Sequence, residues 1–282
     1  MEPNYLSVAI DCGRAHSHAR PYLMDGYMTK LRILAPVLLL GLAPAAALAE
    51  DYRFEVKGTF DRDQTDNFLS DHVDTSKLFG SWYFKPVSTD GVPLSEAAFL
   101  GRASNVTAGV GYVDGFVGTE LDSLAGAINV YIPETIFFAG VAGSRSEVVY
   151  AVNSTTVLKD YVTTWQGTFG VAPIDGLLIT TSIPEGRYDP NLTARHVGKL
   201  PNGHFYAGSV SVVDTELDGT SFGLDFDYYL DDSTSLGAGY DDFRGRWQLR
   251  GEKFFTNDWA AGASIFTDDY SSGFGINATW RH

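Results

Sequence analysis

Charged side chains recur at every second position in segments whose other positions are apolar or aromatic. In the clearest case, Thr220 to Leu230, Asp225 and Asp227 alternate with phenylalanine, leucine and tyrosine. Acidic and basic groups gathered on one face create an electric potential that acts on polar and charged solutes. Such chemistry needs an extended wall with one polar and one apolar face.

The alternation places eleven charged residues on the predicted polar face, which we expect to line a pore. The two aspartates lie on one candidate strand, and two arginines lie two strands later, with Gly237 and Gly239 between them. The long arginines could reach over this glycine gap. They could either set up a transverse field at a constriction or simply pair and fill the interior. The eleven residues are Arg53, Glu55, Lys57, Lys85, Asp225, Asp227, Arg244, Arg246, Arg250, Glu252 and Arg281.

Enzymatic chemistry finds little support. A hydrolase needs a nucleophile with a nearby base, but the sequence contains no G-x-S-x-G motif, and its histidines after residue 50 show no metal-ligand spacing. The acidic run 61–66 lacks the glycine and closing glutamate of a calcium loop. We therefore expect no enzymatic activity, metal or cofactor. The histidines concerned are His72, His196, His204 and His282.

Period-2 alternation recurs from residue 52 to the end of the sequence, as expected for strands with two different faces. Short turns alternate with longer acidic or Ser/Thr-rich loops, which is typical of outer-membrane barrels with both termini in the periplasm. Twelve or sixteen strands remain possible, because Pro86 to Arg102 could be a short helix or an inward-folded plug and Val148 to Leu158 could extend a strand. The fourteen candidate strands are 52–60, 76–86, 104–113, 123–132, 135–143, 161–171, 176–184, 192–200, 204–213, 220–230, 235–243, 245–254, 259–267 and 272–281.

An export signal is predicted at residues 28–49. Met28 is followed by basic residues, an apolar stretch and an A-x-A site, so cleavage is expected between Ala49 and Glu50. The apolar stretch is too short to span a bilayer as a helix. Residues 1–27 precede this signal and are expected to be an over-extended N-terminus without structure. Residues 50–282 would then form one domain, without the single cysteine, Cys12.

The charge balance narrows the possible partners. The chain has 20 Lys and Arg against 35 Asp and Glu, a formal net charge of −15. Nucleic-acid binding depends on basic patches that neutralise phosphates, so it is not expected here. Acidic clusters in the loops, such as 61–74, 214–218 and 268–269, would instead give a pore an acidic mouth that favours cations over anions.

The signal, the alternating strands and the closing stripe of Phe274, Ile276 and Trp280 resemble those of small Gram-negative outer-membrane porins. The run from Pro93 to Leu100, P-L-S-E-A-A-F-L, looks like that of proteobacterial porins. One departure is the ending Trp280-Arg281-His282, because these barrels usually finish on Phe or Trp.

The resemblance implies a single antiparallel transmembrane β-barrel in the outer membrane of a Gram-negative bacterium, with passive diffusion of small hydrophilic solutes or ions. Expected partners are outer-membrane lipid and lipopolysaccharide, the barrel-assembly machinery and small polar solutes. Two alternatives stay open. One is a non-conducting structural or adhesion barrel whose lumen is plugged by Pro86 to Arg102 or by inward charge pairs. The other is a secreted all-β binding protein, in which the alternation would mark the core face.

Overall fold

The computed structural model describes residues 51–282 except 66–71, 117–118, 154–155, 186–189 and 216–218. The predicted signal, its cleavage site at Ala49 and Glu50, and residues 1–27 lie outside the described residues. The described residues form fourteen strands. Their bounds are β1 (Asp51–Thr65), β2 (His72–Ser88), β3 (Asn105–Phe116), β4 (Thr119–Tyr131), β5 (Phe137–Asn153), β6 (Thr156–Val171), β7 (Leu177–Pro184), β8 (Asn191–Lys199), β9 (Phe205–Thr215), β10 (Gly219–Asp231), β11 (Thr234–Asp241), β12 (Arg246–Phe254), β13 (Trp259–Thr267) and β14 (Ser271–Arg281).

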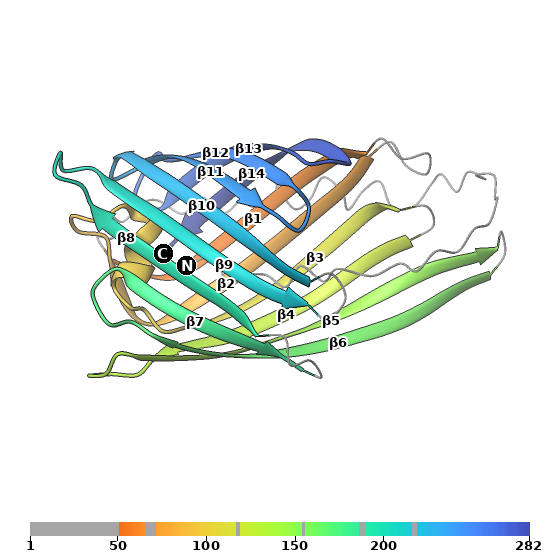
Figure 1. Cartoon of the computed structure of the whole chain (residues 1–282), viewed down its shortest axis with the longest axis horizontal. Coiled ribbons are helices and arrows are strands. Elements are labelled where there is room, and N and C mark those ends of the chain that lie inside the picture. The colour runs from red at the N-terminus through yellow and green to blue at the C-terminus, as the bar shows by residue number, and fades with distance from the viewer. Residues whose placement is uncertain (1–50, 66–71, 117–118, 154–155, 186–189, 216–218) are drawn as a thin grey trace.

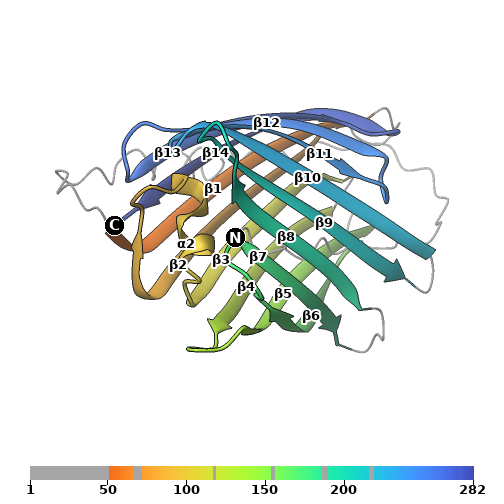
Figure 2. The same cartoon turned by 60° about the vertical axis from the view of Figure 1, so that its left-hand side comes forward.

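The strands close into one antiparallel barrel in which each strand pairs with its neighbours in sequence, and β1 pairs with β14 (Figures 1 and 2). Closure leaves no unpaired sheet edge around the barrel. The predicted number of fourteen strands is confirmed over the described residues. Asp51 and Arg281 lie at the same end of the barrel as the short turns, and we call this end the turn end and the opposite one the loop end.

The two faces of the barrel wall differ as the alternation predicts. Large apolar side chains point outwards and are exposed, among them Leu224 and Phe226 on β10 and Ile265 on β13. The aspartates of β10 point to the other side and contact Arg250. An apolar outer surface facing lipid and a polar interior are the pattern of a transmembrane barrel.

The prediction for Val148 to Leu158 is confirmed as a strand extension. β5 continues to Asn153 and β6 begins at Thr156, and the two strands pair as far as these residues, with a register shift after Ala151. β6 pairs with the shorter β7 only between Gln166 and Val171, so the β5–β6 hairpin projects beyond its neighbours (Figure 1).

The segment between β2 and β3, residues 89–104, does not form a simple turn. It contains the 3-10 helix η1 (Leu94–Glu96) and the one-turn α-helix α2 (Ala97–Leu100). Figure 2 shows α2 inside the barrel outline at the turn end. We call residues 89–104 the inward segment. Among the described residues, no helix is long and apolar enough to cross a membrane.

Candidate functional site: the inward segment and the charged lumen

The inward segment packs against the strands from which it extends. Ala97 and Ala98 of α2 belong to a buried cluster with Tyr52, Tyr83 and Val87 on β1 and β2. Regular alternation would place Tyr52 on the same outer face as Phe54, but a register shift between these two residues turns Tyr52 inwards. Such bulges change the direction of side chains at barrel rims. Here the bulge supplies an aromatic surface on which α2 rests.

A buried carboxylate ties the inward segment to the opposite wall. Arg195 of β8 donates from Nη2 to both carboxylate oxygens of Glu96, at 2.7 and 2.8 Å. The Tyr229 hydroxyl of β10 donates to Glu96 Oε1 at 2.7 Å. Glu96 is 3% exposed. Burial alone would raise the pKa of its carboxyl, but this pKa is held below its ordinary value, and the Arg195 charge is the largest lowering contribution.

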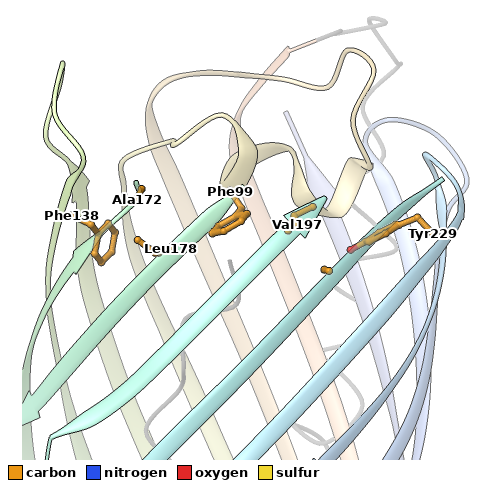
Figure 3. Packing of buried hydrophobic residues seen from close by; sticks show 7 residues of the cluster. Phe99, Phe138, Ala172, Leu178, Val197 and Tyr229 are labelled. Atoms are coloured by element: carbon orange, nitrogen blue, oxygen red, sulfur yellow. The ribbon is translucent and has the colours of Figure 1, made fainter. Parts of the chain in front are cut away.

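An apolar contact accompanies this ion pair. Phe99 of α2 packs in a buried cluster with side chains from five strands and from the turn after β6 (Figure 3). The Arg195 guanidinium lies over the Phe99 ring, 5.0 Å from its centroid. Removing the inward segment from this position therefore exposes a phenylalanine and separates a buried charge pair. The other members of the cluster are Phe138, Ala172, Leu178, Val197, Ala207 and Tyr229.

Hydrogen bonds that involve backbone groups complete the attachment. The Leu94 amide donates to the Asp232 carbonyl at 2.7 Å, and Arg281 Nη1 donates to the Leu94 carbonyl at 2.7 Å. At the other end of the segment, Arg102 donates to the carbonyls of Ala172 and Ile174. The inward segment thus contacts strands or turns on both sides of the lumen at the turn end.

The predicted reach of an arginine over the glycine gap is present between β10 and β12. Arg250 donates from Nε and Nη2 to the Asp227 carboxylate at 2.9 and 2.8 Å, and from Nη1 to Asp225 Oδ1 at 2.6 Å. A Cβ atom at Gly237 of β11 would collide with the Asp227 carboxylate, so only glycine leaves room for this arrangement. Arg250 thus forms ion pairs with both aspartates. Of the two arrangements considered from the sequence, this one is the pairing of opposite charges in the interior.

The other predicted pore-lining residues lie at several levels of the barrel. Arg281 donates from Nε to Glu55 Oε2 at 2.6 Å, and Arg246 Nη2 lies 3.6 Å from Asp63 Oδ1. Arg244 lies in the turn between β11 and β12, outside the predicted strand. Arg53 and Lys85 are exposed near the turn end, and Lys57 and Glu252 are half-buried on β1 and β12. Their role in lining a pore stays a prediction.

The sequence reasoning missed Arg195 and Tyr229. Both belong to the inward set of their strands, but neither stood out, because their partner Glu96 lies about a hundred residues or more away in sequence. The run P-L-S-E-A-A-F was noticed as an irregular segment, and it supplies both Glu96 and Phe99. In the described part of the chain, no group of three or more His, Cys, Asp or Glu side chains is arranged to hold a metal ion.

Comparison with known proteins gives one family and a set of barrels. Residues 28–155 match the model of a family described as "Putative general bacterial porin". No curated protein matches the chain. The solved structure of the Acinetobacter baumannii outer membrane protein Omp33 is similar, with a TM-score of 0.66, 20% identity, and coverage of 83% of this chain and 99% of that one.

Two further solved barrels are more distant. A triple mutant of the Rhodopseudomonas blastica porin has a TM-score of 0.39 at 8% identity, covering 81% of this chain and 99% of that one. A KdgM porin in complex with disordered oligogalacturonate has a TM-score of 0.39 at 7% identity, covering 80% and 98%. The predicted resemblance to bacterial porins is thus confirmed over residues 28–155 by the family model, and Omp33 shares the barrel fold.

Proposed function

We propose that this protein is an outer-membrane porin through which small hydrophilic solutes and ions diffuse passively, with a preference for cations. The observation that carries the proposal is the closed fourteen-strand barrel, apolar outside and polar inside. Barrels of eight strands are filled by their own side chains, whereas larger ones leave an aqueous lumen. The family match supports the same function.

The inward segment lies in the path through the turn end. Glu96 and Phe99 of this segment contact β8 and β10 on the far wall, while Ala97 and Ala98 contact β1 and β2. A solute of any size must pass beside these contacts or break them. We therefore propose two states, one with the inward segment in place and one in which its far-wall contacts are released.

The cation preference rests on the uneven charge of the lumen. Arg250 compensates one of the two aspartates that it contacts, and the Asp225 side chain is still 49% exposed. At the loop end, Asp241, Asp242 and Asp269 are exposed as well. A polar path with an excess of negative charge raises the local concentration of cations.

The test is single-channel recording in planar bilayers with the protein purified from the outer membrane of an expressing bacterium. Stepwise conductance, with a reversal potential across a salt gradient that indicates cations, is expected. Inserted protein that never conducts, in the wild type or in a variant with released far-wall contacts, would contradict the proposal. Heat-dependent migration on gels, typical of folded barrels, confirms that the inserted protein is folded.

A non-conducting structural barrel is the second candidate, and the inward segment favours it directly. The same contacts that we interpret as releasable could hold the lumen closed permanently. Conductance of a variant with a weakened Glu96 contact separates the two candidates. A secreted binding protein is disfavoured, because such a protein would expose the apolar outer face of this barrel to water.

We also propose that the protein acts without enzymatic chemistry or a cofactor. The exposed outer residues, such as Trp165, Trp247 and Phe274, fit contact with outer-membrane lipid and lipopolysaccharide. Insertion into this membrane would depend on the barrel-assembly machinery. Copies of the protein purified with bound lipopolysaccharide would support this placement.

A further inference from the structure

The lumen has two different halves. Charged inward side chains lie on β1, β2, β8, β10, β12 and β14, including Lys77 of β2, which lies beside Gly111 of β3. Phe138, Leu178 and Tyr131 pack on Phe99 or its cluster inside the barrel, so they mark the inward face of their strands. The other inward positions from β3 to β7 are those that share this face. In the ranges 105–111, 123–129, 140–146, 164–170 and 180–182, these inward positions are all uncharged. We call the inward positions of these five ranges the neutral wall.

The neutral wall is rich in hydroxyl and amide groups that pair across neighbouring strands. Two half-buried hydroxyl pairs lie 2.8 and 2.9 Å apart, and the half-buried Asn129 amide donates to the buried Asn105 Oδ1 at 3.2 Å. A paired hydroxyl still has an unused lone pair, and an amide has further donor and acceptor positions. The wall therefore offers hydrogen bonds to the lumen without any charge. The hydroxyl pairs are Ser144 with Thr164, and Thr168 with Ser182.

Several charges on the other half of the lumen are paired. Arg281 pairs with Glu55, Arg250 with two aspartates, and Arg195 with Glu96. An ion leaving bulk water must replace its hydration with groups of opposite charge, or else bear a desolvation cost. A neutral solute loses only hydrogen bonds, and hydroxyl and amide groups replace these in kind.

We propose, on the basis of the porin function proposed above, that the lumen favours neutral, hydroxyl-rich solutes of the sugar and polyol class over charged solutes of the same size. The solute's hydroxyl groups exchange water for the hydroxyl and amide groups of β3 to β7. Among charged solutes, cations pass before anions because of the exposed Asp225.

The experiment measures efflux from vesicles containing the purified full-length protein. The vesicles are loaded with radiolabelled glucose, glucosamine or gluconate, three solutes with the same six-carbon skeleton and neutral, positive and negative charge. Glucose is expected to leave at least about threefold faster than glucosamine, which in turn leaves faster than gluconate, differences on the order of one hydrogen bond. The Glu96→Gln variant is measured in parallel, so that the comparison can be made with the inward segment released.

A double substitution tests the neutral wall itself. Thr164→Val with Thr168→Val keeps the side-chain shape on β6 but removes two inward hydroxyl groups, and it should slow glucose about threefold to tenfold while glucosamine changes less than about twofold. Thr163→Val is the matched control, because Thr163 lies on the same strand and is exposed on the outer face. Circular dichroism and gel migration show whether each variant is folded.

The outcomes separate the two proposals. Equal efflux of the three solutes through a conducting protein would refute the preference and leave the porin function intact. The same holds if the double variant slows all three solutes equally. No efflux of any solute from the wild type or from the Glu96→Gln variant would refute the porin function, and the inference with it.

Discussion

Replacing Glu96 with glutamine should release the inward segment. Glutamine keeps the shape of the side chain and can still accept the hydrogen bond from Tyr229, but it removes the charge that pairs with Arg195. Breaking a buried ion pair costs roughly 3–5 kcal/mol. Arg195 is 22% exposed and can recover part of its hydration, so we expect about 2 kcal/mol for this pair.

A change of about 2 kcal/mol raises the ratio of released to attached inward segment about 30-fold. The assay is the open probability of single channels in planar bilayers, recorded at neutral pH for wild type and Glu96→Gln. The expected result is longer and more frequent openings with the same unit conductance, because the lumen beyond the inward segment is unchanged.

The matched control is Asp175→Asn. Asp175 pairs with Arg102 at 3.4 Å at the same end of the barrel, but its side chain is fully exposed. Arg102 also keeps its bonds to two carbonyls, so this pair should contribute little. If Glu96→Gln and Asp175→Asn change the open probability equally, or neither changes it, the buried pair does not hold the inward segment and the reasoning is wrong.

Three further predictions follow from the same contacts. The pKa of Glu96 is held below its ordinary value of 4.5, so the stabilisation of the attached state is present above that pH and is lost as the pH falls further. The open probability of the wild type should therefore rise below about pH 4.5. A similar rise in Glu96→Gln would show that another group titrates. Gly237→Ala should lower the stability of the barrel by about 1–3 kcal/mol in urea titrations, whereas Gly126→Ala, where a Cβ meets only ordinary contact, should be nearly neutral. The double variant Asp225→Asn with Asp227→Asn leaves Arg250 without its acidic partners. Its reversal potential should shift in the direction that indicates greater anion permeability. An unchanged reversal potential would mean that ions do not pass this cluster.

The sequence was sufficient to predict the barrel, because alternation is a local property of each strand. Segments such as Thr220 to Leu230 show one apolar and one polar face without any knowledge of their neighbours. Short turns alternating with long loops then predicted the antiparallel order. The ends of the strands were less well defined. β5 and β6 extend beyond the predicted ranges 135–143 and 161–171, to Asn153 and Thr156.

Contacts between distant segments were decided only by the tertiary structure. Glu96 meets Arg195 and Tyr229 because closure of the barrel brings β2, β8 and β10 around one lumen, and nothing in the local sequence encodes that meeting. The bulge that turns Tyr52 inwards likewise depends on how β1 pairs with β2. Alternation specifies which side chains face the interior, whereas closure and register specify which of them touch, because contacts across the barrel depend on three-dimensional distance and not on separation along the chain.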